Sequence, residues 1–500
     1  MRTLKSNNTF HPIAILFLGL AMAQVLAFIQ VHLSNIDLHT AISAVSAAGY
    51  VAIPNKQVLP SLLHFWPAFA GGLFFTLSIG AAVSLGSMAA AWSWAHAFKR
   101  NKFILILFLL AWTGFLASLN IRGFALMPTL YFLLIPPVLF LLTAKCGSQV
   151  NSQSKVISRV ACFLPIPLLA LLWFTQFDDA MFVDLRDNLL LSNVAGQKFS
   201  RFYYSYTLYP AEAFKSLDQK SIRTCRLDNI PNRAIYLKIV NRLLANDYFP
   251  LPDIGPVELK ITQKEDFLSF EAGGHRILQV AINRFLAAPG NALHRYSQAT
   301  DRHTVFRQIT FLSILIGFPV LIYIVVHTIF YGLGAIFLNR AGAAVAASAA
   351  CLLIGVIVLI YFQANRSTNI QIGDISEALK SENVYARIAA LKIIERKKLE
   401  IAGYREYQLL LKSRTPQERY WFVRTLAVSR RPATFFDLLT FINDQNINVR
   451  SMAFYSLGLR NNRAAIGPIL EKIKASRDWY TQMYAYKALR TLGWMQAKSH

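Results

Sequence analysis

Residues 70–91 read AGGLFFTLSIGAAVSLGSMAAA, a run of 22 positions without a charged side chain. About 20 apolar residues are enough for an α-helix to cross the hydrocarbon core of a bilayer. The run belongs to a longer apolar segment, 65–97, which has no polar turn at its centre, so we expect one overlong helix rather than two. Its small residues let helices approach closely, which indicates tight helix packing and not a pore. This stretch predicts a membrane protein.

The rest of the chain has the same character. Of its 500 residues, 55% are hydrophobic and only 15% are charged, which is too apolar for an ordinary soluble protein. Seven apolar runs are long enough to span a bilayer: 12–32, 65–97, 103–120, 125–143, 159–177, 308–338 and 341–362. The sequence therefore predicts a polytopic α-helical membrane protein with about seven spans.

The charges divide the chain into four parts. We expect a five-span membrane region over 1–177, an extramembrane α+β domain over 178–305, a two-span membrane region over 306–365 and an α-solenoid over 366–500. The last part carries 23 Lys/Arg against 11 Asp/Glu, which is +12 of the total +25. The predicted spans contain no Asp or Glu, which argues against a carboxylate-driven transporter.

Basic residues in the short loops indicate the orientation. Nine fall on one side of the predicted spans: Arg2, Lys5, Lys99, Arg100, Lys102, Lys145, Lys155, Arg159 and Arg340. Only Lys56 and Arg122 fall on the other side. We expect a bacterial inner-membrane protein with a cytoplasmic N-terminus and periplasmic soluble domains. One miscounted span would move the C-terminal part into the cytoplasm. An A-x-A-like cleavage site occurs at 21–23, but the apolar run continues past it, so we expect a retained anchor.

The sequence predicts neither a metal nor a cofactor. Its four cysteines form no C-x-x-C motif, so a thiolate metal site is not expected. Histidines near the ends of the first two spans fit the membrane interface better than a haem site. His327 lies well inside the sixth span, where a hydrogen bond to a neighbouring helix is the simplest interpretation.

The segment 178–305 predicts helices followed by a small antiparallel sheet of about three strands. VELKIT, 257–262, alternates apolar and polar residues, and DFLSFEAGGHRILQVAI, 266–282, reads as a hairpin with two glycines at its turn. Four carboxylates at 178, 179, 184 and 187 are interpreted as a solvated helix face rather than a metal site. His294, Asp301 and His303 form a possible polar site for acid–base or metal chemistry, but a polar stalk near the membrane is the favoured interpretation.

The stretch SRFYYSYTLYPAEAFKS, 200–216, is unusually aromatic. Phe202, Tyr206 and Tyr209 recur at helical spacing, with Tyr203 beside them. Tyrosine buries its ring and keeps its hydroxyl near water, which suits a membrane interface. We predict packing within the domain or against the bilayer, and a ligand-stacking site is the alternative.

The last 135 residues contain a repeat. Arg387, Arg419, Arg450 and Gln482 share one register at spacings of 32, 31 and 32. Apolar residues recur three and seven positions later, and a second helix is expected in each of the first three units. Helix pairs at this period stack into a solenoid. The pattern resembles the HEAT-like repeats, in the short form named after phycobilisome lyases. Phe422 and Gln482 depart from the usual small residue and arginine. The resemblance implies a scaffold for protein contact.

Turns within the repeat are basic, and stacking should align them along one edge. The residues concerned are Arg396, Lys397, Lys398, Arg430, Arg431, Arg460 and Arg463. Such a ridge favours anionic polymers or lipid head groups; the alternative is that these are simply solvated turns. We expect membrane lipids and a protein as partners, and no nucleic acid.

The predicted function is an integral membrane scaffold or assembly component of the cell envelope, which recruits a protein or anionic partner through the basic solenoid. No known catalytic motif is present, so enzyme activity is not favoured. The alternative is a membrane enzyme or carrier that acts on a lipid-linked or amphiphilic substrate at the outer interface.

Overall fold

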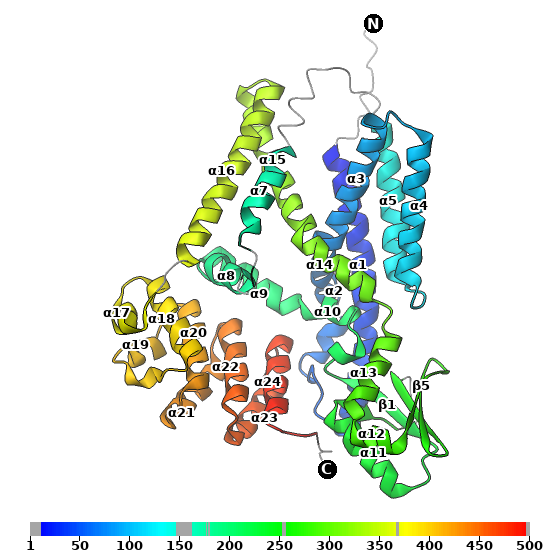
Figure 1. Ribbon diagram of the computed structural model, residues 1–500, viewed down its shortest axis with the longest axis vertical. Helices are drawn as coiled ribbons and strands as arrows, with labels where there is room; N and C mark the ends of the chain where they lie inside the picture. The colour runs from blue at the N-terminus through cyan, green and yellow to red at the C-terminus, as the bar shows by residue number, and fades with distance from the viewer. Residues whose placement is uncertain are drawn as a thin grey trace.

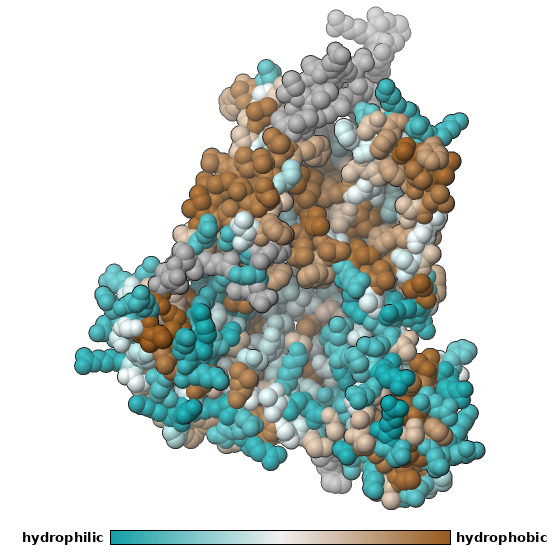
Figure 2. All heavy atoms as spheres, viewed as in Figure 1, coloured by the Kyte–Doolittle hydropathy of each residue, from teal (hydrophilic) through white to brown (hydrophobic). Residues whose placement is uncertain are grey.

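The computed structural model describes residues 12–146, 163–176, 178, 181–252, 257–366 and 370–496. It is mostly helical and contains one small mixed sheet. Figure 1 shows the apolar helices gathered at one end, with the sheet and the C-terminal helices side by side at the other. In Figure 2, hydrophobic residues cover the first end and hydrophilic residues dominate the second.

Six helical segments in the described residues are long and apolar enough to cross a membrane. They are α1 (Pro12–Ala47), α2 to α3 (Phe65–His96), α4 (Lys102–Asn120), α5 (Leu126–Cys146), α14 to α15 (Thr304–Phe337) and α16 (Arg340–Arg366). The second segment joins α2 (Phe65–Phe75) and α3 (Ala81–His96) through one π-helical turn, which confirms a single long helix. The fifth segment joins α14 (Thr304–Leu315) to α15 (Gly317–Phe337).

The fifth predicted span, 159–177, is described only in part. The described part contains α7 (Pro165–Phe174), an apolar helix of 10 residues, so the full length of this span stays a prediction. Helix α7 packs against α16, where Trp173 meets Phe362 with ring centroids 5.6 Å apart. Gly355 permits this approach, because a Cβ there would lie 2.5 Å from Leu169 Cδ2. Residues 147–162, which include part of this predicted run, lie outside the described residues.

Basic loop residues lie at the end of the molecule away from the sheet. The turn between α3 and α4 carries Lys99 and Arg100, and Lys145 is in the last turn of α5 (Figure 1). Arg2, Lys5, Lys155 and Arg159 lie outside the described residues. The sheet and the C-terminal helices lie together at the opposite end (Figure 1).

The sheet has five strands in the order β2-β1-β3-β4-β5. Their bounds are β1 (Arg223–Asp228), β2 (Tyr248–Pro250), β3 (Leu259–Lys264), β4 (Phe267–Ala272) and β5 (His275–Ala281). Antiparallel β3, β4 and β5 confirm the predicted hairpin. The prediction of a three-stranded antiparallel sheet was wrong. The sheet also contains β1 and β2, and it is mixed because β1 runs parallel to both β2 and β3. Helix α11 (Arg233–Ala245) makes the crossover from β1 to β2, and α12 (Ile282–Ala287) and α13 (Pro289–Thr300) follow β5.

Strand β1 was missed because it lacks apolar alternation. Its sequence, RTCRLD, is half charged, and only tertiary pairing on both edges makes it a central strand. Cys225 in β1 is fully buried, and burial raises the pKa of its thiol. Phe270, Phe285 and Tyr296 complete the core of this domain, all fully buried.

Four short helical elements cross the molecule between the apolar helices and the C-terminal helices (Figure 1). They are α8 (Met181–Leu185), the π-helical turn Arg186–Leu190, α9 (Val194–Tyr206) and α10 (Leu208–Ala213). Pro210 lies in the first turn of α10. We call residues 181–213 the crossing segment.

The C-terminal helices, called the C-terminal array, alternate longer and shorter members. The longer ones are α18 (Val384–Lys397), α20 (Pro416–Val428), α22 (Ile447–Arg460) and α24 (Trp479–Thr491). The shorter ones are α17 (Ile375–Lys380), α19 (Tyr407–Leu411), α21 (Ala433–Thr440) and α23 (Ile466–Ala475). The longer helices begin at spacings of 32, 31 and 32, the spacings of the predicted register. Short 3₁₀ turns fill several connections, such as Arg463–Ala465.

The apolar residues three and seven positions after the register form the core of the array. Ala390, Phe422, Ala453 and Ala485 are all fully buried, and so are the apolar residues four positions later. Each longer helix packs on the next one. Phe422 therefore fills core space where the other units have alanine.

Candidate functional site

The register arginines join each unit of the C-terminal array to the next. Arg387 pairs with Glu418, Arg419 Nε lies 2.7 Å from Asp444 Oδ2, and Arg450 Nη2 lies 2.8 Å from Asp478 Oδ2. All six side chains are at least partly buried. Their charges are used inside the array, so these arginines hold the units together and are not available to a ligand.

The last unit breaks this pattern and docks onto residues 51–55, which follow α1. Gln482 is fully buried, and its Oε1 accepts a hydrogen bond from the backbone N–H of Asn55 at 2.8 Å. Asn55 Nδ2 in turn donates to the carbonyl of Ile473 at 2.7 Å. Gln496 also forms two hydrogen bonds with the backbone of Val51. Gln482 thus binds the backbone of Asn55, where the register arginines bind side chains of the next unit.

The sheet domain holds the same end of the array. Tyr486 donates a hydrogen bond to Asp247 Oδ1 at 2.7 Å, and Arg490 Nε lies 3.2 Å from the same oxygen. Asp247 lies immediately before β2, so this contact joins the sheet directly to α24. The last unit is therefore held both by residues 51–55 and by the sheet domain.

The crossing segment lies against the other units. Trp421 Nε1 donates to Asp187 Oδ2 at 2.8 Å, and Lys392 Nζ lies 3.1 Å from Asp184 Oδ1. The Arg186 guanidinium stacks 3.7 Å above the ring of Tyr420. We call this face of α18, α20, α22 and α24 the inner face.

These contacts correct the prediction for the carboxylates. Asp184 and Asp187 were expected on a solvated helix face, but they are only 4% and 3% exposed. The prediction was wrong because the surface that buries them comes from helices more than 200 residues later in the chain, as the separation of 234 between Asp187 and Trp421 shows. In the described residues, no three His, Cys, Asp or Glu side chains are grouped to hold a metal ion.

The aromatic stretch is divided between three environments. Tyr209 is buried against Trp479, with ring centroids 5.1 Å apart, and its hydroxyl is 2.8 Å from Ser61 Oγ. Tyr206 accepts a hydrogen bond from Trp66 Nε1 at 3.0 Å, at the start of α2. Phe202 and Tyr203 remain exposed. The inward part of the stretch thus joins Ser61 and α2 to the array, and the interfacial role of the outward part stays a prediction.

The basic turns lie beside one another. Glu400 accepts hydrogen bonds from Ser429 Oγ and the Arg430 N–H of the next unit. Burial alone would raise the pKa of Glu400, but these hydrogen bonds lower it. Arg460 donates to the carbonyl of Arg431 at 2.7 Å, which joins the second turn to the third.

The predicted ridge residues have different roles. Arg460 is half-buried and also donates to Thr434 Oγ1 at 2.8 Å, so its charge is used within the array. The other six side chains are exposed: Arg396, Lys397, Lys398, Arg430, Arg431 and Arg463. We call Lys398, Arg430, Arg431 and Arg463 the basic edge.

The possible polar site does not assemble from its three members. His294 Nδ1 lies 2.6 Å from Asp218 Oδ2, whereas Asp301 binds Arg307 through both carboxylate oxygens. His303 packs its ring against Phe214. Burial raises the pKa of Asp301, but the hydrogen bonds from Arg307, Thr304 Oγ1 and the His303 N–H outweigh burial and lower that pKa to about 2. Asp301 thus fixes the junction between α13 and α14.

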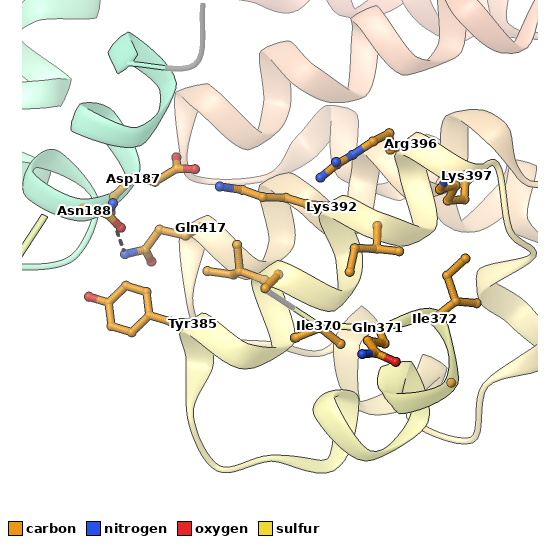
Figure 3. Close-up of a pocket in the computed structure, with 14 residues that line it drawn as sticks. Asp187, Asn188, Ile370, Gln371, Ile372, Tyr385, Lys392, Arg396, Lys397 and Gln417 are labelled. Atoms are coloured by element: carbon orange, nitrogen blue, oxygen red, sulfur yellow. Dashed lines mark hydrogen bonds between the residues drawn. The ribbon is translucent and has the colours of Figure 1, made fainter. Parts of the chain in front are cut away.

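A cavity of about 580 Å³ opens between the crossing segment and the first unit of the array. Its polar lining includes Asp187, Lys392, Arg396, Lys397 and Gln417. Figure 3 shows Lys392 and Arg396 extending from α18 toward Asp187 and Asn188. Sequence reasoning identified only the basic pair at 396–397, because the lining comes from four separate stretches of chain.

No family model, curated protein or solved structure matches this chain.

Proposed function

We propose that this protein is an integral scaffold of the bacterial inner membrane, whose C-terminal array is a HEAT-like solenoid that recruits an acidic protein partner through its basic edge. The observation that carries the proposal is the occupation of the inner face. The crossing segment covers that face through Asp187, Tyr204 and Tyr209, which contact Trp421, Tyr480 and Trp479. The surfaces of the array that remain for a partner are therefore the turns and the shorter helices.

The chemistry of the basic edge favours an acidic partner. Lys398, Arg430 and Arg463 are exposed and belong to turns that are joined by hydrogen bonds between units. Clustered positive charge attracts anionic surfaces and speeds their association, with an affinity that falls as salt rises. Because the array is fixed at both ends to the rest of the chain, it presents this edge in one orientation.

The proposed orientation is an N-terminus in the cytoplasm and an array in the periplasm. The connection with Lys99 and Arg100 and the helix ends with Lys102 and Lys145 lie at the end away from the array. Basic residues in and beside short connections favour the cytoplasm. A reporter fused after residue 500 should be active only in its periplasmic form. Activity of the cytoplasmic form would contradict this orientation.

Site-specific photo-crosslinking in cells tests the recruitment. A photoreactive residue at position 431 should give a discrete adduct with one partner, and charge reversal at Lys398, Arg430 and Arg463 should abolish it. The matched control reverses three exposed cations of the sheet domain: Lys264, Arg276 and Arg284. If the basic edge recruits the partner, the adduct should still form in the control. An adduct that survives charge reversal of the basic edge would refute the proposal.

A further inference from the structure

The cavity at the first unit of the array has an unbalanced positive charge. The charge of Lys392 faces Asp184, and the carboxylate of Asp187 is used by Arg186 and Trp421. Arg396 and Lys397 also line the cavity, and neither forms an ion pair with another described residue. Their side chains are exposed, so an anion could reach them without breaking an existing contact.

A second, independent feature of the cavity is a buried acceptor. Gln417 is 4% exposed, and its Nε2 donates to the carbonyl of Asp187 at 3.2 Å (Figure 3). This bond fixes which end of the amide is the donor. Gln417 Oε1 is then left without a hydrogen-bond partner among the described residues. A buried acceptor without a donor is costly, so a ligand hydroxyl here would be stabilising.

The position of the cavity relates it to the membrane end of α16. Tyr385 lines the cavity, and its hydroxyl lies 2.8 Å from the hydroxyl of Tyr361. Tyr361 belongs to the apolar segment Ala341–Ala364, near its last residue. One pair of tyrosines therefore joins the cavity to the place where this helix leaves the apolar layer.

We infer that this cavity binds the headgroup of an anionic phospholipid that carries free hydroxyl groups, as phosphatidylglycerol does. Arg396 and Lys397 would bind the phosphate, since guanidinium and ammonium groups are the side chains that most often donate hydrogen bonds to phosphate in proteins. Gln417 Oε1 would accept a hydrogen bond from a headgroup hydroxyl. The inference rests on the proposed membrane insertion, but it does not depend on the acidic partner.

Lipid titration of the full-length protein tests the inference. The protein is purified in a neutral detergent, and the binding of short-chain phosphatidylglycerol is counted by native mass spectrometry. Each basic residue near an anionic lipid contributes a factor of about five in affinity. The double variant Arg396→Gln and Lys397→Gln should therefore bind the lipid about 25-fold more weakly.

The control variant removes two exposed cations of the sheet domain, Lys264→Gln and Arg276→Gln, and should bind the lipid as the unchanged protein does. An equal loss in both double variants, or no loss in the first, would overturn the inference. Because this assay contains no protein partner, its failure is distinguishable from a failure of the crosslinking experiment.

Two further arms identify the ligand. Phosphatidylethanol has the same charge but no headgroup hydroxyl, so it should bind more weakly than phosphatidylglycerol. Equal binding would overturn the role of Gln417 Oε1. Millimolar inorganic phosphate should not displace the lipid. Full displacement by inorganic phosphate would show a site for a free anion and would overturn the assignment to a lipid.

Discussion

The joints within the C-terminal array differ from the joints that hold the array to the rest of the chain. Inside the array, one device recurs: an arginine of one unit binds a carboxylate or hydroxyl of the next, as Arg450 binds Asp478 and Thr481. Toward the rest of the chain, every contact is different. Trp421 binds a buried carboxylate, and Gln482 binds a backbone N–H. The repeated joint sets the spacing of the units, and the unrepeated joints decide where the array is placed.

The largest expected effect is at the joint to the crossing segment. Replacing Trp421 by alanine removes a buried ring and the donor to Asp187, and should destabilise the array by about 3–5 kcal/mol. Hydrogen exchange of residues 416–428 measures this loss. Trp66→Ala is the control, because Trp66 also donates through Nε1 but is 53% exposed. Equal destabilisation by the two substitutions would show that the buried contact of Trp421 stabilises the protein no more than the exposed contact of Trp66.

The last unit can be tested by restoring the repeat. Gln482→Arg supplies the residue of the other three units. Its guanidinium keeps a donor for the Ser476 carbonyl, as Arg450 donates to the Asp444 carbonyl, but the acceptor for the Asn55 N–H is lost. Leaving this buried N–H unpaired should cost about 1–3 kcal/mol. Faster exchange in 51–58 and 466–491 is the expected result. A Gln482→Arg variant with unchanged exchange in 51–58 would contradict the docking role.

The joint between the sheet domain and α14 should depend on pH. The pKa of Asp301 is lowered from 3.8 to about 2, so its stabilising contribution is present above pH 3.8 and is lost as the pH falls through about 2. Asp301→Asn should reduce the free energy of unfolding by about 1–2 kcal/mol near neutral pH, since hydrogen bonds to charged groups are stronger than neutral ones. Melting of the detergent-solubilised protein between pH 6 and pH 2 measures both. A variant that keeps the acid-dependent loss would exclude Asp301 as its source.

The smallest effect is expected at the basic edge. Lys398→Gln and Arg463→Gln remove exposed charges, and each should change the stability by less than about 0.5 kcal/mol. Thermal melts of both variants provide the measurement. A larger loss would mean that the edge, like Arg460, is used inside the array.

Much of the fold could be predicted from local patterns. Uninterrupted apolarity located the six segments that the structure contains as long helices, and the positions of Arg387, Arg419 and Arg450 gave the spacing of the longer C-terminal helices. The hairpin around 273–274 was also visible, because alternation and glycine are local signals. Strand β1 was not visible, since its pairing with β2 and β3 decides its role.

The candidate sites were less accessible to such reasoning. The basic turns at 396–398, 430–431 and 460–463 could be found from charge alone, but Arg460 could not be distinguished from its exposed neighbours. His294 and Asp301 are close in sequence, yet they bind Asp218 and Arg307 instead of each other. Proximity along the chain did not indicate a shared site.

The sequence by itself determined the segments that are apolar enough for a membrane, the period of the array and the excess of positive charge in its turns. These properties depend on residues within one helix or one repeat. The tertiary structure alone decided that Asp187 is buried, that Gln482 docks onto Asn55 and that a basic cavity lies beside Tyr361. Those contacts join residues separated by 234 and 427 positions in the first two cases, and no local pattern encodes which distant surface will cover a side chain.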